Sequence, residues 1–436
     1  MMQRKRMLGV GGVAVIAAAA LAGCSGSSGS DANHTVTIMG AFTDAQAKAF
    51  QADLDAWSKS SGVKAKYSGS TDFQTAIVAK AAAGNPPDIA IFPQPGVLAG
   101  QEKTLYPLED LGIDVKSVTS DEAKGLADIA VSGGKTYGLP YSINVKSLVW
   151  YNPAAFQKNN LTVPKTADEL TALEKTITDK GLGYPWCVGI ESGAATGWPA
   201  TDWLEEYVLR DAGADTYKKW IAGDVKFSDA PIKAAGQKVQ SMLLAAGQVN
   251  GGGAAAATTS FQTAGNQLWA DGKDKGQCFM MKQGSFIADF FPDNIKAQIA
   301  QGDTSQVNFF QVPSASGQAN SMEGGGDLVG AYSKDSNTAK VVDYLVSKEF
   351  GTHGYASQAI FLSPHNTFDS TKYTSVLQKN AQTLLKNSTV FGFDASDMMP
   401  AQVGSGTEWK FLTQWFAGQI TMDSAFQQID ASWPSK

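Results

Sequence analysis

Short apolar runs alternate with amphipathic stretches between residues 34 and 96, and the two patterns predict strands and helices in turn. Residues 34–42 (HTVTIMGAF) are typical of a buried strand, and residues 44–62 of a helix that carries Phe50, Leu54 and Trp57 on one face. Strands that alternate with helices indicate parallel βαβ units, in which ligands bind beyond the carboxyl ends of the strands. The pattern continues with a strand at 63–70, a helix that ends at Gly84 and an apolar strand at Ile89–Phe92.

The later pattern predicts two extended segments that pass from one half of the protein to the other. These are residues 135–156 and 307–314, which are rich in Val, Phe, Tyr and Trp. Several crossings imply that each half is built from discontinuous pieces, with the linkers acting as a hinge. The other expected elements are mostly helices at 157–300, a strand at 323–332, an amphipathic helix at 337–356, a turn at 362–365 and a helical hairpin at 406–433 with a break near Gly418.

The longest apolar run lies at the start of the chain, where its sixteen residues from Met7 to Ala22 follow three basic residues. A bilayer core needs about 20 apolar residues, so this run suits a secretory signal peptide better than a membrane span. Leu-Ala-Gly then precedes Cys24, which resembles the lipobox of bacterial lipoproteins. We expect residues 1–23 to be a lipoprotein signal peptide, Cys24 to carry lipid such as palmitate, and residues 24–33 to be a flexible tether. The alternative is a soluble secreted protein whose cysteine is incidental.

Composition limits the partners and the number of lobes. Without residues 1–23 the chain loses three basic side chains and no acidic one, so its formal net charge changes from −6 to −9. An acidic surface without a basic stripe argues against nucleic acid as a partner. The remaining 413 residues exceed what one hydrophobic core usually organises, so we expect two lobes.

Two cysteines remain once Cys24 is assigned to lipid. Cys187 and Cys278 are an even pair in a compartment that permits disulfides. A bridge would close a loop of about 90 residues and, in the chain-entropy model, stabilise the fold by ~4 to 5 kcal/mol. The alternative is two unrelated buried thiols.

Residues for catalysis are scarce, although a secreted two-lobed protein could be a hydrolase. The three histidines are not part of an HExxH metal helix, and there is no GxSxG nucleophile motif. The nearest carboxylate cluster is Asp202, Glu205 and Glu206, whose spacing on a helix is typical of a solvated acidic face rather than of a glycosidase pair. We therefore expect no catalytic residue, no metal and no cofactor.

Residues 251–257 (GGGAAAA) satisfy the GxGxxA pattern of a dinucleotide site. They do not follow a clear strand, and the first βα turn lies elsewhere. We expect a flexible loop of small residues here.

The stretch GIESGAATGWPATDW (189–203) places two indoles among small residues. A sugar ring has apolar C–H faces and a rim of hydroxyls, so it binds to an aromatic plate with polar groups at its edge. We expect Trp203, on the following helix, to lie in the core. Trp198, in a Gly/Pro turn, is expected to contact a ligand.

Polar residues at loops that flank the strands are further ligand candidates, although each alone could equally cap a helix or satisfy a turn. Gly324, Gly325 and Gly326 would let backbone N–H groups reach ligand oxygens, or provide hinge flexibility. The candidate ligand-binding residues are Phe42, Ser70, Asp72, Gln94, Tyr141, Asn144, Trp198, Asp202, Gln283, Ser285, Phe286, Glu323, Gly325, Gly326, Asp327 and His365.

Taken with these motifs, the chain resembles the solute-binding lipoproteins of carbohydrate ABC importers, the family related to maltose-binding protein. Residues 185–203 and 278–292 (CFMMKQGSFIADFFP) resemble the alpha-glucoside-binding subgroup, in which both segments carry a cysteine, and this supports a Cys187–Cys278 bridge. The resemblance is weaker in residues 34–130.

The resemblance implies an α/β, two-lobed periplasmic-binding-protein-like fold of class II, whose discontinuous lobes are joined by a hinge and close on a sugar. The lobes would be residues 34–144 with 313–362, and residues 145–312 with 363–436. By position, Ser70, Gln94, Asn144, Trp198, Ser285, Gly325 and Asp327 would line the site.

The implied function is capture of an alpha-glucoside or related oligosaccharide by a monomer anchored on the extracytoplasmic face of the cell membrane, with delivery to an ABC permease. The alternatives are the same fold binding a peptide or a polyamine, and a glycoside hydrolase.

Overall fold

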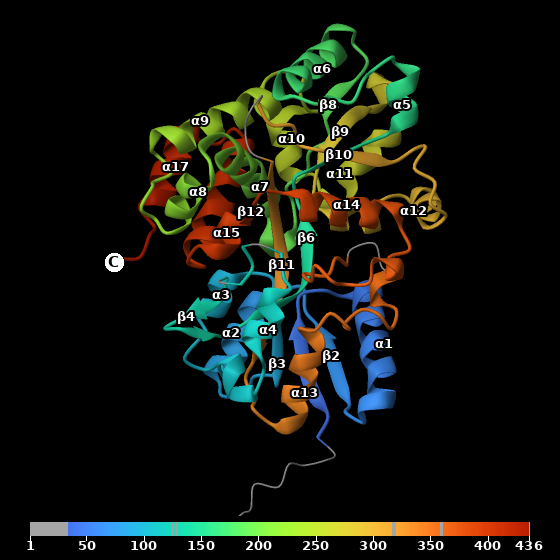
Figure 1. Ribbon diagram of the computed structural model, residues 1–436. Coiled ribbons are helices and arrows are strands. Elements are labelled where there is room, and N and C mark those ends of the chain that lie inside the picture. Colours follow the sequence, from blue (N-terminus) through green and yellow to red (C-terminus); the bar gives the residue numbers. More distant parts are fainter. Residues whose placement is uncertain (1–33, 124, 128, 316–319, 358–360, 436) are drawn as a thin grey trace, which may run out of the picture. The chain divides into compact units, whose positions relative to one another are not determined.

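The computed structural model describes residues 34–123, 125–127, 129–315, 320–357 and 361–435 (Figure 1). The expected signal peptide, Cys24 and the tether lie outside these residues and stay predictions. Among the described residues, no helix combines the length and the apolarity that a membrane crossing requires.

The larger sheet begins with the expected βαβ units. Strands β1 and β2 pair in parallel, as do β1 and β3. Helix α1 ends where Gly62 adopts a left-handed φ of 71°, and its Phe50 and Leu54 are buried, as the pattern predicts. The elements are β1 Val36–Gly40, α1 Asp44–Ser61, β2 Ala65–Gly69, α2 Phe73–Ala82, β3 Ile89–Phe92, α3 Pro95–Ala99, η1 Leu108–Leu111, α4 Val115–Ser120 and the β4 Val131–Ser132 and β5 Lys135–Thr136 hairpin.

Three later strands, β6, β11 and β12, continue the larger sheet past the carboxyl ends of β1 to β3. In β11 (Ser321–Ala331), residues 328–331 pair antiparallel with β3, while residues 324–329 pair with β6 (Leu139–Val145). Its first residues pair in parallel with β12 (Val390–Phe393). Residues 321–327 of β11 therefore extend beyond the end of β3, at the edge where a ligand is expected.

A smaller sheet has the order β10-β7-β9-β8. Strand β6 is separated from β7 by only two residues, and β10 precedes β11 along the chain, so the chain crosses between the sheets at both expected places. The elements of this part are β7 Leu148–Tyr151, α5 Pro153–Lys158, α6 Ala167–Asp179, β8 Tyr184–Trp186, η2 Gly193–Ala195, α7 Trp198–Tyr207, η3 Val208–Ala212, α8 Ala214–Ile221, α9 Ala230–Val239, η4 Gln240–Leu244, α11 Phe261–Ala264, η5 Gly265–Trp269, η6 Lys273–Lys275, β9 Cys278–Lys282, η7 Ser285–Phe290, α12 Asp293–Ala300 and β10 Asn308–Gln311.

The C-terminal part confirms the helical hairpin. Helices α16 and α17 are separated near Gly418, whose φ is +72°. The expected lobe boundaries stay a prediction. Strand β12 lies in the range 363–436 that we expect in the second lobe, yet it pairs into the larger sheet. The remaining elements are α13 Ser336–Leu345, η8 Tyr355–Ser357, η9 Ser370–Lys372, α14 Val376–Asn387, α15 Ala395–Met398, η10 Val403–Glu408, α16 Trp409–Phe416 and α17 Met422–Asp430.

Two expectations about helices are wrong. Residues 251–257 are not a loop, because α10 (Gly252–Thr258) begins there and buries Ala256 and Ala257. Alanine is the best helix former, and a side chain at Gly253 would collide with the backbone oxygen of Phe416, so the small residues permit close helix packing. The helix expected at 337–356 ends at Leu345, and Phe350 lies buried in the core beyond its end.

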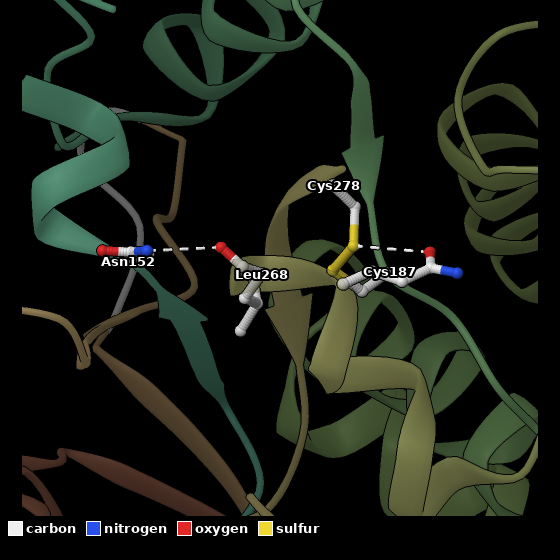
Figure 2. The surroundings of a disulfide bond; sticks show 5 residues. Asn152, Cys187, Leu268 and Cys278 are labelled. Carbon is white, nitrogen blue, oxygen red and sulfur yellow. Dashed lines mark hydrogen bonds between the residues drawn. A yellow bond between two sulfur atoms is a disulfide. The ribbon is translucent and has the colours of Figure 1, made fainter. Parts of the chain in front are cut away.

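A disulfide joins Cys187, directly after β8, to Cys278, the first residue of β9 (Figure 2). The two Cα atoms are 5.3 Å apart and the sequence separation is 91 residues. The bridge confirms the pairing expected from the sequence, and it ties the two parallel strands at one edge of the smaller sheet.

We expect the double variant Cys187→Ser/Cys278→Ser to unfold at a lower temperature and urea concentration than the wild type. The bridge closes a long loop, so its loss should reduce the free energy of unfolding by up to ~5 kcal/mol. Thermal and urea unfolding measure the change. Wild type treated with a reductant should approach the variant, and identical midpoints for both proteins would contradict the stabilising role.

Candidate functional site

Polar side chains alternate with apolar ones along β6 and β11 beyond the end of β3. Successive side chains of a strand point to opposite faces, so Asn144 and Lys146 share one face while Ile143 and Val145 share the other. Asn144 opposes Gly325 in the register, and its Oδ1 accepts a hydrogen bond from the Gly325 N–H at 3.2 Å. We call the polar face formed by Ser142, Asn144, Lys146, Glu323, Gly325 and Asp327 the β6–β11 stripe.

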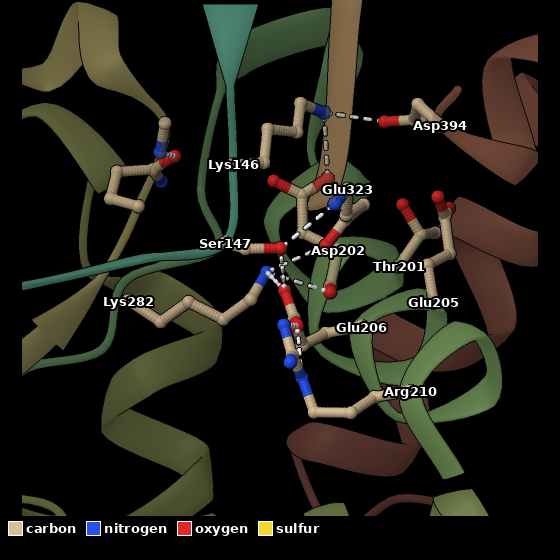
Figure 3. Close-up of polar contacts among 12 residues, drawn as sticks. Lys146, Ser147, Thr201, Asp202, Glu205, Glu206, Arg210, Lys282, Glu323 and Asp394 are labelled. Carbon is tan, nitrogen blue, oxygen red and sulfur yellow. Dashed lines mark hydrogen bonds and ion pairs between the residues drawn. The ribbon is translucent and has the colours of Figure 1, made fainter. Parts of the chain in front are cut away.

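Lys146 lies between the sheets and is paired with two carboxylates. Its Nζ donates to Asp202 Oδ1 at 2.8 Å and to Asp394, and the three side chains are at most 7% exposed (Figure 3). Asp202 lies on α7, and Asp394 caps the first turn of α15. Burial alone would lower the pKa of Lys146, but the charges of Asp202 and Asp394 raise it well above its usual value. Lys146 is therefore a buried ammonium that connects the stripe to two helices.

A second buried cation connects the two sheets directly. Lys282 of β9 donates from Nζ to Glu323 Oε2 of β11 at 2.9 Å and to the Asp202 carbonyl at 2.9 Å. Between these groups, Ser147 Oγ donates to Glu206 Oε2 at 2.7 Å and accepts from the Glu323 N–H at 2.8 Å. The charged side chains at this crossing are thus held by partners from both sheets.

The acids of α7 are buried, and the expectation of a solvated acidic face is wrong. Asp202, Glu205 and Glu206 are at most 4% exposed. Arg210 Nε donates to Glu206 Oε1 at 2.8 Å, and the charges of Arg210 and Lys282 hold the pKa of Glu206 low against the effect of burial. Burial raises the pKa of Asp202 to about 6, while Lys146 opposes this rise. Helix α7 is surrounded by protein, so Asp202 and Glu206 face cations instead of water.

Glu205 has a different role from its neighbours. Its carboxylate accepts hydrogen bonds from the backbone N–H groups of Ala395 and Ser396, at 2.5 and 3.1 Å, at the start of α15. Tyr217 Oη also donates to it at 3.3 Å. Burial and the charge of Asp394 raise the pKa of Glu205 well above its usual value. Glu205 therefore positions the turn that carries Asp394.

Three carboxylates of this network have the spacing of a metal site. Oxygens of Asp202, Glu323 and Asp394 lie within 4.8 Å of one another. Lys146 and Lys282 already pair with these oxygens, so two ammonium groups supply the positive charge that a metal ion would bring. The donor set gives no reason to assign a metal.

Trp198 lies against the stripe. It is the first residue of α7, and Lys146 Nζ lies 5.2 Å from the centre of its ring. The indole is half-buried, its Nε1 donates to Ser192 Oγ at 3.0 Å, and its ring contacts Phe261 and Phe286 edge-on. Trp198 belongs to neither apolar core, so an aromatic face stands beside buried polar groups.

Trp203 is 3% exposed, packs edge-on against Trp186 at 5.0 Å and belongs to the second core, as the sequence predicts.

Several other candidates lie at the stripe or next to it. Ser285 Oγ accepts the Val145 N–H of β6 at 3.4 Å, and Phe286 contacts Trp198 at 5.7 Å between ring centres. Gln94 follows β3, and its side chain hydrogen-bonds to Asp397 of α15. Burial raises the pKa of Asp327 to about 7.

The remaining candidates lie in other surroundings. Phe42 stacks on Tyr67 at 4.3 Å in the larger core, which also contains Tyr141. His365 bonds through Nε2 to the Val346 carbonyl at 3.0 Å, and burial lowers its pKa. The others are Ser70, half-buried after β2, Asp72, exposed at the start of α2, Gln283, whose Oε1 accepts the Gly284 N–H, and Gly326, buried in β11.

Sequence reasoning missed Lys146 and Asp394. Lys146 continues the period of two that Ser142 and Asn144 begin within an apolar crossing, and that period is a readable signal. Asp394 directly follows the short apolar strand β12, but nothing in the sequence indicates that this strand lies beside β11.

The arrangement of two sheets joined by β6, β10 and β11, with a polar stripe and an indole at the junction, is that of a two-domain periplasmic binding protein. The chain belongs to the bacterial extracellular solute-binding protein family, whose profile matches residues 43–352. Its family consists of solute-binding proteins, so the chain is a binding component and not an enzyme.

Two curated relatives match almost the whole chain. The alpha-glucosides-binding periplasmic protein AglE of Rhizobium meliloti is 33% identical over 92% of this chain and 87% of its own length. The osmoprotective compounds-binding protein GgtB of Synechocystis is 32% identical over 92% of both chains. A solved chitin oligosaccharide binding protein superposes with a TM-score of 0.73 at 17% identity, covering 91% of this chain and 97% of its own, which supports the fold.

We expect Lys146→Met to reduce the free energy of unfolding by about 3–5 kcal/mol, because Asp202 and Asp394 would be left buried without their cation. Urea unfolding measures the loss. Lys158→Met is the matched control: Lys158 pairs with Asp271 at 3.0 Å, but both side chains are at least 70% exposed, and exposed pairs contribute little. An equal loss of unfolding free energy in the two variants would show that burial does not determine how much the Lys146 pair contributes to stability.

Proposed function

We propose that this protein captures an alpha-glucoside or related oligosaccharide outside the membrane and delivers it to an ABC transporter permease. The observation that carries the proposal is Trp198, a half-buried indole beside the buried Lys146–Asp202 pair. The relatives support the same class, since AglE is described as binding alpha-glucosides. Solved structures with the same fold include a cyclic alpha-maltosyl-1,6-maltose binding protein and a maltose-bound protein.

The chemistry of the site suits a neutral molecule with many hydroxyls. An indole face packs against the C–H face of a sugar ring, and the stripe offers the Asn144 amide and the Asp327 carboxyl at its edge. A wrong epimer would leave a buried donor or acceptor unpaired, at ~1 to 3 kcal/mol for each group. The protein should therefore distinguish between related sugars.

We propose a hinge at the chain crossings, with lobes of residues 34–144 and 313–362, and of residues 145–312 and 363–436. Strand β12 (residues 390–393) pairs with β11 of the larger sheet, although it falls in the second of these ranges. Two residues, Lys146 and Ser147, separate β6 from β7, so a change in lobe angle would act on their contacts.

The anchoring part of the proposal rests on the sequence of the first 33 residues. Cys24 would carry the lipid, and residues 24–33 would link it to β1, whose first residue is Val36. Such a monomer would stay on the extracytoplasmic face of the cell membrane, within reach of a permease.

A polyamine is the second candidate ligand. Acids outnumber cations around α7 and α15. The charge of Asp394 raises the pKa of Glu205, Asp397 and Glu408, and the charge of Glu408 also raises that of Glu205. A ligand with ammonium groups would compensate this excess. Calorimetric titration with maltose, trehalose, sucrose, spermidine and a tripeptide separates the candidates, and heat from spermidine or the peptide alone would reject the sugar proposal.

We expect Trp198→Ala to weaken the binding of the preferred disaccharide at least tenfold, because loss of about 1.4 kcal/mol of aromatic contact already gives that factor. Isothermal titration calorimetry measures the dissociation constant. The control is Trp57→Ala, which removes an indole that stacks on Tyr344 at 4.6 Å on the outer helix α1. An unchanged affinity for Trp198→Ala would show that the indole is not part of the site.

We expect Cys24→Ser to release the protein from the membrane fraction, because it removes the acyl attachment point. The measurement is fractionation of cells combined with metabolic labelling by a palmitate analogue. Label and membrane association in the wild type but not in the variant are the expected result. A wild type that is unlabelled and found in the medium would favour the soluble secreted form.

A further inference from the structure

Four buried polar atoms on three residues near Asp397 of α15 have no hydrogen-bond partner among the described residues. They are both carboxyl oxygens of Glu408, Nε1 of Trp409 and Oε1 of Gln94. Glu408 is 0% exposed and is the last residue of η10, directly before α16. Buried polar groups are nearly always paired in folded proteins, so four such atoms at one place need a reason.

The junction lies directly beside Trp198. Gly197, the residue before Trp198, has a φ of +120°, and a Cβ on it would lie 2.6 Å from the Cα of Trp409. A Cβ on Gly96, two residues after Gln94, would collide with the Met399 oxygen at the end of α15. The starts of α7 and α16, the end of α15 and the loop after β3 therefore come together here.

We propose that Glu408, Trp409 and Gln94 form the inner end of the sugar site and bind a pair of neighbouring hydroxyls on the ligand's terminal ring, with Glu408 uncharged. This inference rests on the proposed function and names the groups that recognise the ligand.

The charges around Glu408 define its state. Burial raises the pKa of Glu408 well above its usual value, and Asp394 and Asp397 of α15 add to the rise. Glu205 of α7 is also close enough to interact, and Lys146 is already engaged by Asp202 and Asp394. In the proposed site Glu408 is a carboxylic acid, which has one O–H donor and one acceptor oxygen.

The donor and acceptor set matches a diol. The Glu408 O–H and the Trp409 N–H donate, while the Glu408 carbonyl oxygen and Gln94 Oε1 accept. Each sugar hydroxyl both donates and accepts, so two adjacent hydroxyls would use all four atoms. An ammonium group only donates and would leave the Trp409 N–H and the Glu408 O–H unpaired.

The test compares Glu408→Gln with Glu408→Leu by calorimetry, using the disaccharide that binds the wild type most tightly. Glutamine keeps a donor and an acceptor, so its dissociation constant should stay within about threefold of wild type. Leucine should raise the dissociation constant at least tenfold. The melting temperature of the ligand-free protein should be kept or increased, because an apolar group replaces an unpaired polar one. If Glu408→Leu fails to fold, Gln94→Leu serves in its place with the same expected loss.

A pH series adds a readout that a purely structural residue would not move. Wild-type affinity should fall as pH rises through the pKa of Glu408, whereas the affinity of Glu408→Gln should vary less over the same range.

A Leu variant that binds like wild type would mean that the junction holds water only and would overturn the inference, with sugar binding itself intact. Tighter binding of the amino analogue of the disaccharide than of its neutral parent would also overturn it. Absence of binding by every saccharide tested would instead reject the proposed function together with this inference.

Discussion

The ammonium group of Lys146 between Asp202 and Asp394 is the contact on which the arrangement of the two sheets depends. β6 belongs to the larger sheet and β7 to the smaller one, and only Lys146 and Ser147 separate them. Removing a lysine and two carboxylates from water costs several kcal/mol for each ion, so the site is stable only because each charge has its partner in place. The chain crossing is thus held by specific pairs, with Ser147 and Lys282 adding the contacts to Glu206 and Glu323.

The same pair orients the proposed sugar platform. Trp198 and Asp202 are four residues apart on α7, so their side chains lie on one face of the helix. When Asp202 binds Lys146, the face that carries Trp198 is turned toward the stripe, and the ammonium lies over the indole. Glu206, a further four residues along, binds Arg210 and Ser147 on the next turn. One helix therefore brings the ligand-facing indole and the acids of the crossing into a fixed relation.

The sequence allows the βαβ units, both crossings, the cysteine pair and the burial of Trp203 to be predicted, because each depends on local periodicity or on a short motif. Where the burial or role of a residue depends on contacts with distant parts of the chain, the sequence-based expectation was wrong or absent. The acids of α7 have the spacing of a solvated face, but inside the protein Lys146 pairs with Asp202, and Arg210 and Lys282 pair with Glu206. Alanine and glycine at 251–257 fit a loop by composition, yet close contact with α16 selects a helix. Asp394 becomes visible as a site residue only when β12 is placed beside β11, and Glu408 only when η10 is placed beside α15.

The polar character of the crossing has a consequence for a protein that closes on a solute. Buried ion pairs contribute little net stability compared with well-packed apolar residues, since the Coulomb attraction mainly offsets the lost hydration. Of these ion pairs, Lys282–Glu323 joins the two proposed lobes. If the lobes separate, its ammonium and carboxylate regain water, so this pair favours neither arrangement strongly, whereas an apolar junction would favour the closed one. A ligand shifts such an equilibrium only by its difference in affinity for the two arrangements. A nearly balanced junction therefore lets the modest free energy of sugar binding decide the lobe angle, while the charged pairs still define a single geometry when the lobes meet.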